Sequence, residues 1–205
     1  AAKELKRDME TALLSNVAKA AGNATTARKL GGCPTWYETN VDAGSGGSGA
    51  GNGAIRTDGT QRAFTEDQLK GILVSCYNEG GNPNMIMVNA FNKQKLSGFT
   101  GGSTRFDAAE DRRLITSIDV YESDFGTMQV SPNRFIRGAN GTAAKIGQDA
   151  HILDMEYWAV SFLRDFALQT PAQTADADQR FMVAEYTLES RNEKASGLIT
   201  DLTTS

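Results

Sequence analysis

The stretch SIDVYESDFGTMQVSPNRFIR, residues 117–137, carries the clearest structural signal of the sequence. Apolar and polar residues alternate with a period of two on both sides of Asp124-Phe125-Gly126, and Pro132 ends the second run. Alternation around a short turn that contains glycine predicts a β-hairpin. Kinases use the letters D-F-G to hold magnesium, but that function also needs a glycine-rich nucleotide loop, a strand lysine and an upstream H-R-D loop. The only histidine, His151, lies downstream, so we interpret these three residues as a turn.

Composition and charge restrict the class of protein. The 205 residues, 40% hydrophobic and 22% charged, suffice for one domain or two small ones with a proper core. No apolar run approaches the roughly 18 residues that span a bilayer, and no signal-peptide pattern is visible. The net charge of −4 argues against general nucleic-acid binding. Cys33 and Cys76 lie far apart, which predicts two reduced, partly buried thiols in an intracellular setting.

Residues 1–21 predict an amphipathic helix that Gly22-Asn23 closes. Its apolar stripe recurs at steps of four and consists of Leu5, Met9, Leu13 and Val17, widened by Ala12 and Ala20. The helix begins without a capping side chain. This beginning indicates either the removal of an initiator methionine or a chain that was trimmed before Ala1.

A glycine-rich segment, AGSGGSGAGNGA, occupies residues 43–54. Gly44, Gly46 and Gly49 have the spacing G-x-G-x-x-G, which a dinucleotide site uses between a strand and a helix. Further glycines follow here instead of a helix. We therefore predict a mobile surface loop.

Residues 64–97 alternate between helix and strand. A capping box at Thr65–Gln68 predicts a helix that ends at Gly80-Gly81. Its inward face consists of Leu69, Ile72, Leu73 and Cys76. Residues 85–88 predict a buried strand, and residues 90–97 predict further helical turns. This alternation indicates a mixed sheet with helices on its faces.

From residue 117 onward the sequence is mainly β. Residues 157–163 and 181–189 predict two long strands, and residues 170–179 form the turn between them. Residues 138–147 are rich in glycine and alanine and predict a loop. A final apolar run passes through Leu198, Ile199 and Leu202.

The sequence contains no convincing group of residues for a metal site or a catalytic triad. One histidine and two separated cysteines exclude a zinc site of the usual kind. His151 could serve a Ser-His-Asp triad, but no G-x-S-x-G elbow is present, so a structural role is favoured. Asp176 and Asp178 form D-x-D without an EF-hand loop and predict a solvated turn.

A mixed-charge patch is the other candidate site. It consists of Asp107, Glu110 and Asp111 with Arg105, Arg112 and Arg113. Paired carboxylates of this kind could perform acid–base chemistry, but a salt-bridged surface is favoured. We therefore predict no catalytic, cofactor-binding or metal-binding residues, and no enzyme.

Four strings, in this order, resemble those of a family of tailed-phage major capsid proteins. They are FTEDQLKGILVSCYNEGGNPNMIMVNAFNKQKLSGF, DVYESDFGTMQVSPNRF, LDMEYWAVSFLRDF and EYTLESRNEKASGLITDL. The resemblance spans nearly the whole chain and is weakest over the glycine-rich segment. It implies the Johnson fold that tailed-phage capsids share with encapsulin shells. This is an α+β fold with a spine helix and long strands in a peripheral domain, and with a mixed α/β axial domain.

The resemblance also implies domain boundaries. Residues 1–40 and 155–190 resemble the peripheral domain, with residues 1–21 as its spine helix and residues 158–169 and 181–190 as the long strands beside it. Residues 41–154 and 191–205 resemble the axial domain. In that family an N-terminal arm and an extended loop precede the spine helix, and neither is present here. The resemblance thus implies a core fragment that is monomeric or weakly associated on its own.

The function that the resemblance implies is structural. A major capsid protein self-assembles through pentamers and hexamers into an icosahedral shell around phage double-stranded DNA. The implied partners are other copies of the chain, with scaffold, protease, portal and decoration proteins, and only non-specific proximity to DNA. The implied location is the virion, after the host cytoplasm, without a membrane. Two alternatives stay open, an encapsulin-type shell protein and a small hydrolase that uses His151 or the charged patch.

Overall fold

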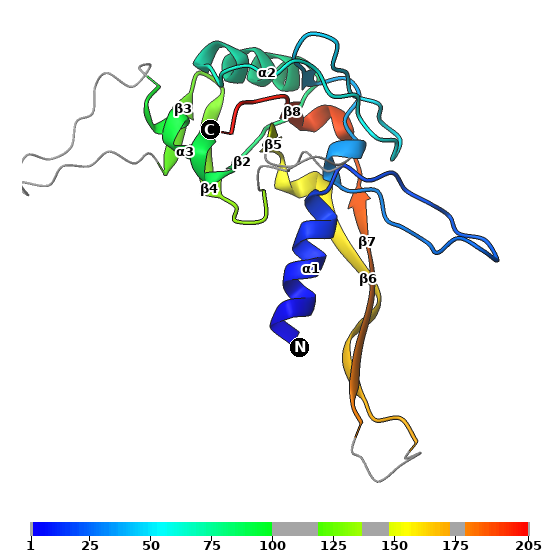
Figure 1. Cartoon of the computed structure of the whole chain (residues 1–205). Coiled ribbons are helices and arrows are strands. Elements are labelled where there is room, and N and C mark those ends of the chain that lie inside the picture. Colours follow the sequence, from blue (N-terminus) through cyan, green and yellow to red (C-terminus); the bar gives the residue numbers. More distant parts are fainter. Residues whose placement is uncertain (1, 100–118, 137–147, 173–178, 205) are drawn as a thin grey trace, which may run out of the picture.

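The computed structural model describes residues 2–99, 119–136, 148–172 and 179–204. Figure 1 shows two parts, a six-stranded sheet with two helices and a long two-stranded ribbon that extends away from it. The first helix, α1 (Ala2–Leu14), runs beside the base of the ribbon, and the C-terminal residues lie within the sheet part. The described residues thus combine helices and sheets in an α+β arrangement, as predicted.

The six-stranded sheet is mixed. Its order is β1 (Val41–Asp42), β8 (Gly197–Ile199), β5 (Ala150–Leu153), β2 (Met85–Val88), β4 (Gly126–Pro132) and β3 (Val120–Ser123). The pairs β1–β8 and β2–β4 are parallel, and the other neighbours are antiparallel. The predicted mixed sheet is therefore confirmed.

The predicted hairpin is formed by β3 and β4. Ser123 pairs with Gly126 across Asp124-Phe125, and Gly126 adopts a φ of 144°. Tyr121, Met128 and Val130 are buried on one face of the hairpin, as the period of two requires. The turn interpretation of Asp124-Phe125-Gly126 is therefore confirmed.

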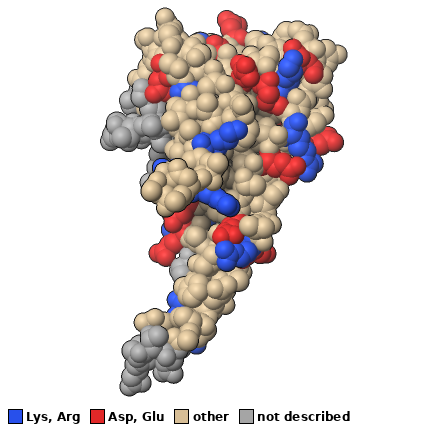
Figure 2. All heavy atoms as spheres, turned by 90° about the vertical axis from the view of Figure 1, so that its right-hand side faces the viewer, with Lys and Arg blue, Asp and Glu red and all other residues tan. Residues whose placement is uncertain are grey.

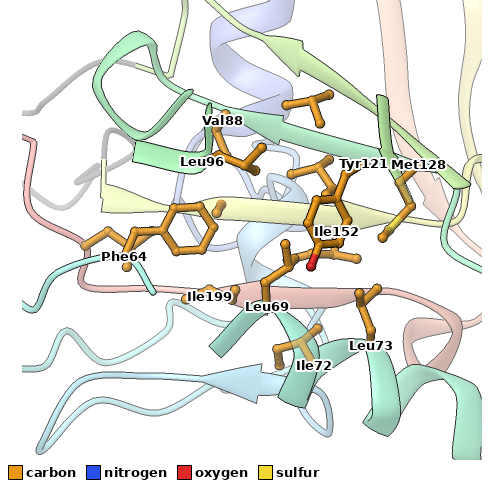
Figure 3. Packing of buried hydrophobic residues seen from close by; sticks show 14 of the residues in the cluster. Phe64, Leu69, Ile72, Leu73, Val88, Leu96, Tyr121, Met128, Ile152 and Ile199 are labelled. Atoms are coloured by element: carbon orange, nitrogen blue, oxygen red, sulfur yellow. The ribbon is translucent and has the colours of Figure 1, made fainter. Parts of the chain in front are cut away.

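Helix α2 (Glu66–Asn78) covers the sheet and supplies much of its core. Thr65 accepts a hydrogen bond from the backbone of Gln68, and the Gln68 side chain accepts one from the backbone of Thr65, which confirms the capping box. The predicted inward residues Leu69, Ile72, Leu73 and Cys76 are all buried. Figure 3 shows Leu69 and Ile72 packing with Ile152 and Ile199 of the sheet. Burial of each such side chain stabilises the fold by about 1.5–3 kcal/mol.

Strand β2 and helix α3 (Ala90–Ser97) also follow the sequence prediction. The side chain of Asn89 caps α3 by accepting a hydrogen bond from the backbone of Asn92. Leu96 of α3 and Ile86 and Val88 of β2 are fully buried in the same core cluster as the inward face of α2. One core therefore joins both helices to the centre of the sheet.

The ribbon consists of β6 (Trp158–Gln169) and β7 (Phe181–Ser190). The strands are antiparallel, from Trp158 paired with Ser190 at the base to Gln169 paired with Phe181, with register shifts in β6 around Arg164. Both predicted long strands are confirmed; β6 continues beyond the run at residues 157–163 to Gln169, the end that the family resemblance implied. Much of the predicted turn, residues 173–178, lies outside the described residues, as does the predicted loop at residues 138–147.

The predicted end of the first helix is wrong, because α1 stops at Leu14 and not at residue 21. The Ser15 hydroxyl donates back to the carbonyl of Ala12, and Asn16 accepts from the backbone of Arg56 at 3.1 Å. Ala20 then forms an isolated β-bridge with Lys29. These contacts with distant segments override a helical period that continues to Val17.

Residues 43–54 form an irregular, partly exposed segment without a helix, as predicted, but backbone contacts hold it to the rest of the chain, and its mobility stays a prediction. The backbone amides of Gly51 and Gly53 donate to the carbonyls of Tyr37 and Thr35. A Cβ atom added at Gly44 would lie 2.0 Å from the carbonyl oxygen of Thr60. Glycine is needed here because backbone packs on backbone. No helix follows directly, so the G-x-G-x-x-G spacing does not form a dinucleotide turn.

The sequence prediction missed strand β5, which pairs with both β2 and β8. All four of its residues are buried, in the order Ala150, His151, Ile152 and Leu153. The only local signal was an apolar run of four residues that contains a histidine.

Candidate functional site

The ribbon carries several large apolar side chains that the described chain leaves exposed to solvent. Leu163 is 81% exposed and Leu168 is 58% exposed, and Phe162 and Phe181 are 43% and 44% exposed. An isolated two-stranded ribbon is at best marginally stable in water. Exposed groups of apolar side chains commonly mark a surface that contacts another molecule. The ribbon is therefore the candidate functional site, as an assembly surface.

Aromatic contacts link part of the ribbon to α1. The ring of Phe162 lies 5.8 Å from that of Phe166 and 6.2 Å from that of Tyr186, measured between centroids. The Lys6 ammonium of α1 lies 5.6 Å from the centroid of the Phe166 ring. The Lys6–Phe166 contact joins the ribbon to α1, the two ring contacts lie within the ribbon, and Leu163 and Leu168 remain exposed.

Two hollows accompany the base of the ribbon. A cavity of about 860 Å³ lies between the ribbon and residues 20–30, and it is lined by Arg28 and Lys29 with Phe162 and Tyr186. A smaller cavity of about 260 Å³ lies between α1 and the ribbon. Its lining is largely apolar and includes Leu13, Leu14, Met87, Trp158 and Leu188. Apolar concave surfaces are thus present close to exposed apolar side chains.

The ribbon carries exposed ion pairs, which contribute little to stability. The Arg164 guanidinium binds the carboxylate of Glu185 across the strands, which lowers the pKa of Glu185. Glu189 accepts hydrogen bonds from Ser161 and Arg191. Figure 2 shows that charged side chains gather over the upper part and the ribbon base, whereas the lower ribbon is mostly uncharged on this side. A contact through the lower ribbon would therefore be mainly apolar.

His151, the candidate catalytic residue of the hydrolase alternative, is buried in β5. Its Nδ1 lies 3.9 Å from the Sγ of Cys33, whose thiol is 3.3 Å from the Tyr37 hydroxyl. Burial, and then the charge of Arg56, lower the pKa of His151 to about 3. Burial raises the pKa of Cys33 to about 12. In this conformation the imidazole has no surface for a substrate, and the thiol stays protonated near neutral pH.

A buried ionic cluster, which sequence reasoning missed, surrounds Arg56. Its guanidinium contacts Asp149 at 2.8 Å, Asp58 at 2.8 Å and Asp201 at 3.3 Å. The side chains of Arg56, Asp149 and Asp201 have no exposed surface. The members are dispersed along the chain, so no local motif signalled them. The cluster is closed to solvent at Asp149 and Asp201, so we regard it as structural.

The model of the SU10 major capsid protein family matches residues 1–203 of the chain. The chain belongs to this family. A comparison with curated proteins found no match. The predicted resemblance to phage major capsid proteins is therefore confirmed, and the match favours the phage family over the encapsulin alternative. Membership identifies a structural protein of the virion capsid, which is not an enzymatic kind of protein.

Several residues of this capsid protein that were considered as candidate sites and interpreted as surface or turn residues lie outside the described residues. They are Arg105, Asp107, Glu110, Asp111, Arg112 and Arg113 of the mixed-charge patch, and Asp176 and Asp178 of the D-x-D pair. Elsewhere, within the described ranges, no cluster of histidine, cysteine, aspartate and glutamate could hold a metal ion. Cys33 and Cys76 are buried free thiols. Over the same ranges, no helix is long and apolar enough to cross a membrane.

Proposed function

We propose that this capsid protein self-assembles into the icosahedral shell that encloses the double-stranded DNA of a phage. The observation that carries the proposal is the exposed apolar ribbon in a chain whose family forms capsids. Contacts between unlike surfaces of neighbouring copies close into rings, which become pentamers and hexamers. The ribbon supplies one surface, and the apolar hollow between α1 and the ribbon base supplies a complementary one.

We further propose that the chain has the Johnson fold. Residues 1–40 and 155–190 form its peripheral domain, in which α1 is the spine helix, and residues 41–154 and 191–205 form its axial domain. The ribbon extends away from the six-stranded sheet in Figure 1, which supports this division, and α1 joins the two parts because Leu14 packs with Met87 and Ile136. Scaffold, protease, portal and decoration proteins belong to the proposed set of partners.

Replacing an exposed apolar residue of the ribbon tests the proposal. Leu163→Lys adds a charge at a position that is 81% exposed, so the subunit should fold normally. The matched control is Val120→Lys on the edge strand β3, where the side chain is 61% exposed. We expect negative-stain electron microscopy of the protein, expressed from its natural start codon, to show closed shells for the wild type and for Val120→Lys. Leu163→Lys should yield only small soluble particles.

Circular dichroism of the purified variants separates a failure of assembly from a failure of folding. Both variants should melt within a few degrees of the wild type. Closed shells from Leu163→Lys would contradict the role of the ribbon. The absence of shells from every form, with scaffold protein co-expressed, would contradict the proposed self-assembly itself.

A further inference from the structure

The cluster around Arg56 joins segments of the chain that are far apart in sequence. Asp149 immediately precedes β5, and Asp201 follows β8 near the C-terminus. Arg56 comes from the segment that follows the glycine-rich loop, and Gly44 of that loop donates its amide to Asp201 at 3.0 Å. We call this assembly of Arg56, Asp58, Asp149 and Asp201 the Arg56 joint. Through Asp201, the Arg56 joint is one of several contacts that hold the glycine-rich segment against the rest of the chain.

The Arg56 joint holds more negative than positive charge. Three carboxylates surround one guanidinium, and two of them, Asp149 and Asp201, are fully buried. Charges away from water are costly unless they are paired, and like charges at close range favour protonation of one member. One buried acid in the Arg56 joint should therefore hold a proton at a pH where exposed acids are ionised.

The hydrogen bonds show which acid that is. The Asp201 carboxylate accepts from the amides of Gly44 and Gly59 and from the Thr200 hydroxyl, all of which favour its ionised form. Asp149 has only the guanidinium on Oδ1, and its Oδ2 has no hydrogen-bond partner among the described residues. Asp149 is consequently the acid that gains most from a proton.

A base with the opposite preference lies two residues further along β5. His151 is fully buried, its Nε2 has no hydrogen-bond partner among the described residues, and the Arg56 charge opposes its protonation. The other titratable groups that face this region are Cys33 and Tyr37, whose protonated forms are favoured by burial. They therefore add no charge to it near neutral pH.

We propose that the Arg56 joint is a proton-linked lock in which Asp149 carries a proton inside the folded subunit while His151 stays neutral. The Arg56 joint is most stable when Asp149 is protonated, because the buried excess of negative charge is then reduced by one. The two residues couple stability to pH with opposite signs. When one of the two residues is replaced, the pH dependence of stability should therefore reflect the other residue alone.

The directions of the pKa shifts agree with this geometry. Burial raises the pKa of Asp149 from 3.8 to about 7, against the lowering effect of Arg56 and with the raising effect of Asp201. Stabilisation by Asp149 is therefore complete below its unfolded pKa of 3.8 and is lost as the pH rises toward 7. The pKa of His151 is lowered from 6.5 to about 3, so its stabilisation is present above 6.5 and lost as the pH falls. Between about pH 4.5 and 6.5 the two effects oppose each other.

Melting temperatures of the purified chain between about pH 4.5 and 8 test the proposal with Asp149→Asn and His151→Gln. Each is compared with the wild type at the same pH, which removes the effect of acids common to all three. We expect the melting temperature of Asp149→Asn, relative to the wild type, to rise with pH by about 4 °C per pH unit up to about pH 7, because the wild type loses the stabilisation from Asp149 over that range. The melting temperature of His151→Gln, relative to the wild type, should fall with pH by about as much up to pH 6.5. Asp124→Asn, on the hairpin turn, controls for the loss of one surface carboxylate.

Differences from the wild type that do not depend on pH would overturn the proposal. If either variant fails to fold, carbon-13 NMR of the wild type gives the answer directly. The Asp149 carboxyl carbon should titrate near pH 7, and a midpoint at its ordinary value of about 4 would contradict the lock. His151 is the only histidine, so its ring signals are assigned at once, and they should not shift between about pH 5.5 and 8.

Discussion

The six-stranded sheet and the two-stranded ribbon use similar residues in different ways. In the sheet, apolar side chains such as Ile86, Ile152 and Ile199 have no exposed surface. In the ribbon, Leu163 and Leu168 remain largely in solvent although the strands are the longest in the described chain. The contrast shows that the sheet part has a core of its own, whereas the ribbon carries apolar side chains that the described chain leaves exposed.

The glycine-rich segment beside the sheet makes close backbone contacts, although its composition is typical of a flexible loop. Gly44 and Gly59 approach backbone atoms closely and donate their amides to Asp201. The ribbon shows the reverse, since a sequence typical of a buried strand is exposed. Composition alone therefore predicts neither the close packing of the glycine-rich segment nor the exposure of the ribbon strands in this capsid protein.

The largest difference between the two parts should appear when an apolar side chain is truncated. Ile152→Ala in β5 should reduce the free energy of unfolding by about 2–5 kcal/mol, because it leaves a cavity in a packed core. Leu168→Ala in the ribbon should change that free energy by about 0.5 kcal/mol or less in the free subunit. Urea unfolding measures both values. A similarly large loss for Leu168→Ala would show that the ribbon belongs to the same core as the sheet.

A smaller effect should distinguish the packed glycine-rich segment from a mobile loop. Gly44→Ala would place a Cβ atom 2.0 Å from the Thr60 carbonyl oxygen, so we expect a loss of about 1–3 kcal/mol in the free energy of unfolding. The control is Gly71→Ala in α2, where no atom lies within 4 Å of the added Cβ. It should stabilise the chain by about 0.5–1 kcal/mol in the same urea titration. Neutral behaviour of Gly44→Ala would support the prediction of a mobile loop.

Elements with a strong local signal could be predicted from the sequence. The hairpin of β3 and β4 follows from alternation around a glycine turn, and α2 follows from the capping box at Thr65. The end of α1 could not be predicted, because Asn16 is drawn away by the distant backbone of Arg56. Strand β5 was missed because four residues without turn signals carry little information.

The Arg56 joint and the exposure of the ribbon could not be predicted either, because both depend on contacts that exist only in the folded chain. The Arg56 joint depends on residues that are separated by up to 145 positions, so its charge balance appears only in the folded chain. The exposure of β6 could not be seen either, because WAVSFLRDFALQ has the composition of a strand that packs on another surface. We infer that a neighbouring copy of the chain supplies the surface on which β6 packs. The resemblance to capsid proteins, by contrast, was carried by whole strings of sequence and was confirmed by the family match.

Hydrogen–deuterium exchange of the free and the assembled protein tests the central claim most directly. In the free subunit, amides of β6 and β7 should exchange much faster than those of β2, β5 and β8, because no core protects the ribbon. In purified shells the ribbon amides should become as slow as those of the sheet. A ribbon that is already protected in the free subunit, or that still exchanges rapidly in the shell, would contradict the claim that neighbouring copies stabilise it.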